Sequence, residues 1–123
     1  MKTIVTGGAG FIGSHLVERL VQDGHQVIII DNLSTGRTDN LKHVDQTKFS
    51  LINADIADLN AIRDCFEGVD WVFHLAALAD IVPSITYPHR YHRSNVDGTL
   101  AVLEAARLHG IKKLVYAASS SCY

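Results

Sequence analysis

The sequence predicts an α/β fold with one doubly wound parallel sheet, and three patterns in its 123 residues support that prediction. Five short apolar runs are typical of strands, and segments with helical spacing lie between them. A glycine-rich turn joins the first run to the first helical segment. Strands that alternate with helices pair in parallel through right-handed crossovers. The length suits one hydrophobic core and therefore one domain.

The expected strands are short and rich in β-branched residues, as in a sheet that is covered on both faces. The run Gln26-Val27-Ile28-Ile29-Ile30 shows this most clearly. The polar segment 31–48 is expected to be irregular. We predict strands at residues 3–6, 26–30, 49–52, 71–75 and 113–117.

The helical segments repeat apolar residues at intervals of three and four. The first begins near Ile12 and stops at Gly24. The second follows Asp58, which is a favourable N-cap, and ends at Gly68. The third is long and is expected at residues 91–109, before Gly110. Its apolar stripe consists of Val96, Leu100 and Leu103.

The glycine-rich turn has the spacing of a phosphate-binding loop. It follows a strand and opens a helix, which is the context that makes such a motif specific. Glycine permits the sharp turn, the close approach of a pyrophosphate and the close packing of helix on strand. The helix N-terminus offers free N–H groups to the anion. We expect dinucleotide binding through Gly7, Gly10, Phe11, Ile12 and Gly13.

Asp31 ends the second strand at the distance from the turn where dinucleotide-binding folds place a ribose-binding acid. Its carboxylate would accept a hydrogen bond from the ribose 2′-hydroxyl and repel a 2′-phosphate. The expected cofactor is therefore NAD rather than NADP. Arg37 is a counter-signal because arginine can accept that phosphate, but its polar setting favours a solvated loop residue.

Composition argues against several other classes of function. The formal net charge is -2, so nucleic acid is not an expected partner. No apolar run is long enough to cross a membrane. Two cysteines form no disulfide framework, which favours a cytoplasmic protein. No metal site is expected, because His89 and His92 lack further ligands at suitable spacing.

Five stretches in register resemble the extended short-chain dehydrogenase/reductase family. Within it they are most similar to the nucleotide-sugar epimerases and dehydratases of the UDP-glucose 4-epimerase type. Those proteins share the dinucleotide-binding Rossmann fold. The stretches are Thr6-Gly7-Gly8-Ala9-Gly10-Phe11-Ile12-Gly13, Asp31-Asn32-Leu33-Ser34-Thr35-Gly36, His74-Leu75-Ala76-Ala77, Asn95-Val96-Asp97-Gly98-Thr99 and Ser119-Ser120-Ser121-Cys122-Tyr123.

The resemblance implies roles for residues outside the turn. Asn32 and Ser34 match residues that hold the adenosine ribose, and Asp55 and Ile56 match the pair that meets the adenine. The small residues after the fourth strand let the cofactor pass. Further matches in cofactor-binding positions are Leu75, Ala76, Ala77 and Asn95. Matches near the sugar are Ser84 and Ser119.

In the family, Ser119 corresponds to the catalytic Ser/Thr that hydrogen-bonds the sugar 4-hydroxyl. The resemblance implies transient oxidation of the sugar at C4 to a ketone. A Tyr-x-x-x-Lys pair on the next helix takes part: the Tyr accepts the 4-hydroxyl proton, and the Lys lowers the pKa of the Tyr and holds the ribose. These 123 residues contain no such pair. The chain is therefore expected to be a partial NAD-binding domain, residues 1–123, that lacks the substrate domain and is inactive alone.

Three alternatives accompany the 4-epimerase hypothesis. A 4,6-dehydratase of this family carries Asp and Glu after the catalytic Ser/Thr, and a decarboxylase tends to keep the Glu. Here Ser120 and Ser121 occupy those positions, which favours the epimerase. The third alternative is a non-catalytic NAD-binding module, because fold does not fix function. The resemblance also implies a homodimer in which each subunit gives two long helices to a four-helix bundle; the helix at residues 91–109 would be one of the two, and the other is not in these 123 residues.

Overall fold

A computed structural model describes residues 1–119 and contains one five-stranded sheet in the order β3-β2-β1-β4-β5. All neighbouring strands are parallel. The strands are β1 (Lys2–Thr6), β2 (Gln26–Asp31), β3 (Phe49–Asn53), β4 (Trp71–His74) and β5 (Lys113–Tyr116). Each lies within one residue of its predicted limits, so the predicted fold class is confirmed.

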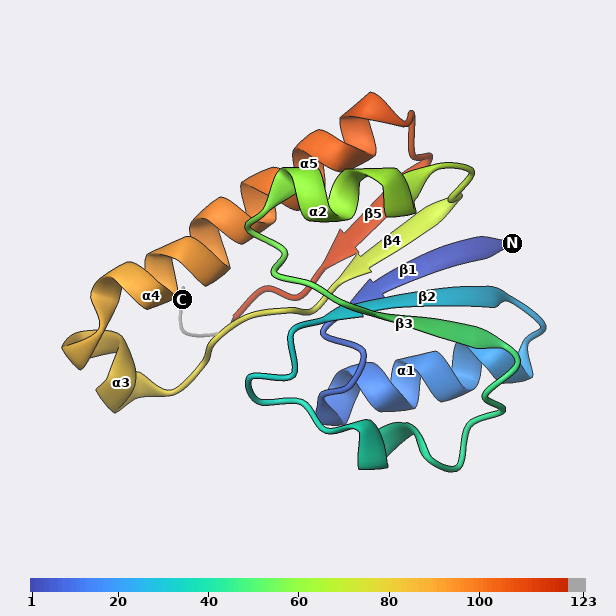
Figure 1. Cartoon of the computed structure of the whole chain (residues 1–123), viewed down its shortest axis with the longest axis horizontal. Helices are drawn as coiled ribbons and strands as arrows, with labels where there is room; N and C mark the ends of the chain where they lie inside the picture. Colours follow the sequence, from blue (N-terminus) through green and yellow to red (C-terminus); the bar gives the residue numbers. More distant parts are fainter. Residues whose placement is uncertain (120–123) are drawn as a thin grey trace.

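The strand order places a switch point between β1 and β4. The chain runs from β1 outward to β3, then returns to β4 beside β1 and continues to β5 in the other direction. Figure 1 shows α1 (Phe11–Gln22) on one face of the sheet, with α2 (Leu59–Ile62) and α5 (Gly98–Leu108) on the other. A crevice at the carboxyl ends of the strands follows from this reversal.

Two apolar layers hold the helices to the sheet. On the α2 and α5 side, Ile4, Val72 and Phe66 belong to one buried cluster. On the α1 side, Val17 and Ile29 belong to the other. Strand β2 supplies residues to both layers, as its continuous apolar run predicted.

The two shorter helices form as their caps predicted. Gly24 ends α1 with a positive φ of 86°, a conformation that glycine adopts without strain. The Asp58 carboxylate accepts a hydrogen bond from the backbone N–H of Ala61 and caps α2. A 3₁₀ turn (Arg63–Phe66) continues α2 and buries Phe66 completely.

The long helix is more complex than the prediction. It begins with α4 (Pro88–His92), passes through a π-helical turn (Arg93–Asp97) and continues as α5. Its start at 91 was wrong by three residues, because Pro88 occupies the first helical position, where a missing N–H is harmless. The periodic spacing carried no signal of the π-helical turn.

The face that α5 buries is made of small residues rather than of the predicted apolar stripe. Its buried residues are Gly98, Ala101, Val102, Ala105 and Ala106. A Cβ on Gly98 would lie 2.7 Å from the Ile56 side chain, so small residues let the helix approach the sheet closely. The residues of the stripe remain about half exposed; they are Val96, Leu100 and Leu103.

Two short elements were not predicted. Helix α3 (Ile81–Thr86) follows β4 and contains Pro83. A 3₁₀ turn (Thr38–Leu41) lies in the segment expected to be irregular. Within residues 1–119, no helix combines the length and the apolar character that crossing a bilayer requires.

Candidate functional site

A cleft of about 730 Å³ opens at the carboxyl edge of the sheet, beside the switch point. Its lining brings together nearly every residue that the sequence assigned to cofactor binding. The expected residues that line it are Gly7, Gly10, Phe11, Ile12, Gly13, Asp31, Asn32, Ser34, Asp55, Ile56, Leu75, Ala76 and Ala77. The remaining one, Asn95, lies behind the cleft wall and is described below.

The glycine turn is tight at two points where a side chain would collide with backbone. Gly7 has a φ of 72°, and a Cβ there would lie 2.9 Å from the Ala76 nitrogen. A Cβ on Gly13 would overlap the Gly7 carbonyl oxygen. By contrast, the nearest atom to a Cβ on Gly10 would be at 3.3 Å, and Gly10 lines the cleft. Gly7 and Gly13 therefore shape the turn, whereas Gly10 keeps the cleft open.

The N-terminus of α1 faces this cleft and is suited to an anion. Gly10 is the N-cap residue and supplies no side chain to the first turn. No acidic side chain lies in that turn, so the positive end of the helix dipole is not neutralised locally. N–H groups of a first turn lack partners within the helix. The turn thus fits the pyrophosphate of a dinucleotide.

Asp31 is 8% exposed at the end of β2 and organises the same turn. One carboxylate oxygen accepts a hydrogen bond from the Ala9 N–H at 3.0 Å, and the other accepts from the Leu33 N–H at 2.8 Å. Each carboxylate oxygen can accept a second hydrogen bond. A ribose hydroxyl can therefore bind Asp31 without displacing either backbone group. The sequence missed this structural role, since spacing alone carries no sign of it.

The segment after β2 is held against the glycine turn by hydrogen bonds to the Ala9 carbonyl. The Arg37 N–H and the Asn40 amide both donate to the Ala9 carbonyl, at 3.0 and 2.8 Å. The Asn32 side chain accepts from the Ser34 N–H at 3.1 Å. From this loop the cleft is lined by Asn32, Ser34, Thr35 and Gly36.

The expected adenine side of the cleft contains an ion pair that the sequence did not predict. The Asp55 carboxylate accepts from the Ala57 N–H at 2.9 Å, and its other oxygen lies 2.9 Å from the Arg93 guanidinium. Both side chains are substantially exposed, so the pair contributes little to stability. It does connect the loop after β3 to the long helix.

The loop after β4 forms the wall between the glycine turn and the long helix. The N–H groups of Leu75 and Ala76 both donate to the Thr6 hydroxyl, at 3.0 and 3.1 Å. The Asn95 amide accepts from the Leu78 N–H at 2.8 Å and donates to the Leu78 carbonyl at 2.9 Å. Asn95 therefore supports this loop from behind.

The two serines expected near the sugar lie in different settings. The Ser84 hydroxyl donates to the Ile81 carbonyl within α3. Ser119 follows β5 at the carboxyl edge, where the preceding Ala117 lines the cleft and donates its N–H to the His74 carbonyl at 3.2 Å. The predictions for Ser120, Ser121, Cys122 and Tyr123 lie outside the described residues.

Several lining residues escaped the sequence analysis, and most come from the loop after β4, α3, α4 and the π-helical turn. Helices α3 and α4 are short, and each contains a proline, so no periodic signal marked them. The missed residues of this region are Leu78, Ala79, Asp80, Pro83, Arg90, Tyr91, Arg93 and Ser94.

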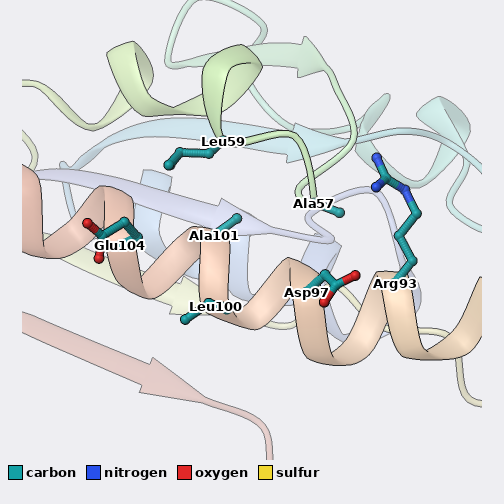
Figure 2. Close-up of a pocket in the computed structure, with 7 residues that line it drawn as sticks. All are labelled: Ala57, Leu59, Arg93, Asp97, Leu100, Ala101 and Glu104. Atoms are coloured by element: carbon teal, nitrogen blue, oxygen red, sulfur yellow. The ribbon is translucent and has the colours of Figure 1, made fainter.

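A second hollow of about 440 Å³ lies between α2 and the long helix, away from the strand ends. Figure 2 shows Leu100, Ala101 and Glu104 of the helix on one side of it and Leu59 on the other. Arg93 lines both hollows. The smaller one has no glycine turn in its lining, so the larger cleft is the candidate nucleotide site.

Comparisons with known proteins agree with this geometry. A UDP-glucose 4-epimerase of Mycolicibacterium smegmatis is 45% identical over 122 residues, which are 97% of this chain and 39% of the relative. A UDP-N-acetylglucosamine 4-epimerase from Methanobrevibacter ruminantium superposes with a TM-score of 0.92 at 40% identity and covers 99% of this chain. A Thermus thermophilus UDP-glucose 4-epimerase in complex with NAD has a TM-score of 0.87 at 38% identity and covers 97%.

The chain spans about 39% of the length of these relatives: 39% of the first two and 38% of the third. The family model that matches residues 3–123 describes the NAD dependent epimerase/dehydratase family. That match extends over nearly the whole sequence and includes the glycine turn, Asp31 and the loop after β4. The chain belongs to the NAD dependent epimerase/dehydratase family.

Proposed function

We propose that the protein to which this chain belongs is an NAD-dependent nucleotide-sugar 4-epimerase of the UDP-glucose or UDP-N-acetylhexosamine type. The observation that carries the proposal is the cleft at the switch point, with the glycine turn at one end and Asp31 beside it. Relatives at 45% and 40% identity are 4-epimerases that act on such sugars.

In this proposal, the chain holds the adenosine and pyrophosphate of NAD. The N-terminus of α1 binds the pyrophosphate, and Asp31 accepts a hydrogen bond from the ribose. Asn32 and Ser34 complete the ribose site, while Asp55 and Ile56 border the adenine. When bound, NAD supplies the electron acceptor for transient oxidation at C4 of the sugar.

Ser119 is the proposed catalytic residue of this chain. It follows β5 at the edge of the sheet where ligands of open α/β folds bind. Its hydroxyl would hydrogen-bond the sugar 4-hydroxyl and help to move the proton there. Ser84 is proposed to border the same sugar.

The second candidate is a 4,6-dehydratase or decarboxylase of the same family. Water loss needs an acid and a base beside the sugar, and dehydratases carry Asp and Glu after the catalytic Ser/Thr. The sequence has Ser120 and Ser121 there, which favours the epimerase. A non-catalytic NAD-binding protein is the third candidate, and the full-length sequence discriminates it through the Tyr-x-x-x-Lys pair.

The test is an assay of the full-length protein with UDP-galactose and with its N-acetyl relative. The expected result is conversion of each sugar nucleotide to its 4-epimer, which chromatography of the sugar nucleotides measures. Release of a 4-keto-6-deoxy sugar would replace the epimerase with the dehydratase. Turnover of neither sugar, together with tight NAD binding, would favour the binding module.

We further propose that the full-length protein is a cytoplasmic homodimer. The exposed stripe of Val96, Leu100 and Leu103 on the long helix supports the dimer, since a second copy would remove these side chains from water. The small number of cysteines supports a reducing compartment.

A further inference from the structure

His74 links three elements behind the cleft wall through its imidazole ring. It is the last residue of β4 and is 6% exposed. Its Nδ1 lies 2.7 Å from the Thr6 hydroxyl at the end of β1. Its Nε2 lies 2.9 Å from the Thr99 hydroxyl on α5.

The direction of these hydrogen bonds follows from the donors around Thr6. The Thr6 oxygen already accepts from two backbone N–H groups, those of Leu75 and Ala76. The Leu75 N–H is shared with the Thr6 carbonyl at 3.2 Å, but the Thr99 hydroxyl gives its one proton to the Asn95 carbonyl and so accepts from Nε2. In a neutral ring Thr6 then donates its proton to Nδ1 of His74. Nδ1 is therefore unprotonated.

The next two hydrogen bonds of the network run in the same direction, from His74 to Thr99 and from Thr99 to Asn95. A neutral ring with an unprotonated Nδ1 carries its proton on Nε2 and donates it to the Thr99 hydroxyl. Thr99 in turn donates to the Asn95 carbonyl at 2.6 Å. Burial lowers the pKa of the His74 imidazole, which is consistent with a neutral ring.

This network holds both ends of the loop that lines the cleft. At one end, Leu75 and Ala76 are anchored to Thr6. At the other end, the Asn95 side chain makes two hydrogen bonds to the Leu78 backbone. The backbone carbonyl of Asn95 accepts a hydrogen bond from the Thr99 hydroxyl. Between these anchors lies Ala77, which the resemblance places along the path of the cofactor.

We propose that His74 is a positioning residue for the dinucleotide: as its Nε2–H tautomer, it locks the loop Leu75–Leu78 against the glycine turn so that NAD can cross the switch point. The inference rests on the proposed NAD binding. The geometry that carries it is the single direction of the hydrogen bonds from Thr6 through His74 to Thr99.

The first measurement needs no ligand. ¹⁵N-labelled imidazole resonances of the full-length protein near neutral pH are expected to show His74 as a neutral ring with the proton on Nε2. A proton on Nδ1, or a cationic ring, would overturn the inference, since the Thr6 hydroxyl would then face a donor.

The second measurement compares three variants for binding of NAD and of AMP. His74→Asn keeps an acceptor near the position of Nδ1, and its NAD affinity should stay within about threefold of wild type. His74→Leu removes both hydrogen bonds and should weaken NAD by about tenfold or more. Thr99→Val breaks only the hydrogen bond between His74 and the helix, so its loss of NAD affinity should be smaller. If His74→Leu does not fold, Thr99→Val still tests the inference.

AMP separates positioning from general destabilisation, because it reaches the adenosine side and not the loop after β4. We expect AMP affinity to change little in the three variants. Parallel losses of AMP and NAD affinity, or unchanged NAD affinity in both His74→Leu and Thr99→Val, would overturn the inference. If the wild type binds no NAD, the proposed function fails with the positioning role, whereas the tautomer measurement is unaffected.

Discussion

The two sides of the cleft are built by different means. On the adenosine side, residues 7–37, the donors are backbone N–H groups, and two of them donate to one carboxylate, that of Asp31, from 22 and 2 positions away. On the other side, the loop after β4 depends on side chains that are distant in sequence, such as Thr6 and His74, 68 positions apart. The adenosine side therefore depends on contacts between nearer segments, whereas the other side depends on contacts between distant ones.

Large apolar side chains are exposed on both sides of the cleft: on the adenosine side, Phe11 is 77% and Ile12 is 70% exposed. The second side carries α3, where Ile81, Val82 and Ile85 are each more than 70% exposed. The stripe on the long helix lies beyond it, and Tyr116 of β5 is 65% exposed. Contiguous exposed apolar patches of this kind commonly mark ligand grooves or interaction surfaces.

The largest predicted effect separates two glycines of the same turn. Gly13→Ala should prevent folding of the turn, because its Cβ would overlap the Gly7 carbonyl oxygen. Gly10→Ala should fold, since its nearest neighbour would be at 3.3 Å, yet it should lose NAD affinity because the new methyl group enters the cleft. Thermal unfolding and NAD titration of both variants check this. Equal stability of the two would contradict the assignment of their roles.

The next effect concerns Ser119 on the other side of the cleft. In the full-length protein, Ser119→Ala should lower kcat about 10²-fold, near the low end for a general acid–base contribution. NAD affinity should stay unchanged, because the hydrogen bond strengthens only as C4 becomes a ketone. Ser119→Thr is the matched control, since it keeps the hydroxyl. An unchanged kcat in Ser119→Ala would limit Ser119 to a structural role.

A smaller effect is expected at the exposed stripe. Leu100→Lys should convert the proposed dimer to a monomer, because burying an unpaired ammonium in a helix interface is unfavourable. Leu108→Lys is the control, since Leu108 is half exposed and is not part of the stripe. Light scattering measures both. A monomeric wild-type protein, or a dimeric Leu100→Lys variant, would contradict the dimer proposal.

The smallest effect is a pH dependence of stability that His74 should cause. Burial lowers its pKa below the ordinary value of 6.5, so the unfolded chain binds a proton at a higher pH than the folded chain does. The stabilisation is therefore complete above 6.5 and is lost as the pH falls toward the folded pKa. Its hydrogen-bond partners are the hydroxyls of Thr6 and Thr99, and Tyr116 is its register neighbour.

Urea unfolding of wild type and His74→Asn between about pH 8 and pH 5 measures this difference. The wild type should lose more stability than the variant on acidification, because other ionisable groups are common to both. A larger loss in His74→Asn would contradict the buried neutral ring.

The contrast between the two sides also explains what sequence could predict. The strands, the glycine turn and Asp31 follow from local patterns, and the structure places them together as expected. The apolar stripe at Val96, Leu100 and Leu103 predicted a helix correctly but not which face is buried. Periodicity reports a helix, whereas the burial of Gly98 and Ala101 depends on how closely the sheet approaches.

Residues of the second side escaped prediction for a physical reason. Thr6, His74 and Thr99 lie on three elements, and no spacing in the chain marks their hydrogen bonds. The Asp55–Arg93 ion pair likewise joins residues 38 positions apart. The resemblance did point to this region through cofactor-binding positions at Leu75–Ala77 and Asn95, and the structure gives Asn95 a specific contact with Leu78.

The most direct test of the central claim is calorimetric titration of the 123-residue chain with AMP, NAD and NADP. If the adenosine side is complete in this chain, AMP and NAD should both bind, and NADP should bind more weakly than NAD, because Asp31 repels a 2′-phosphate. The Asp31→Ala variant should lose about 1–3 kcal/mol of NAD binding free energy. NADP binding more tightly than NAD, or AMP failing to bind while NAD binds, would contradict the account.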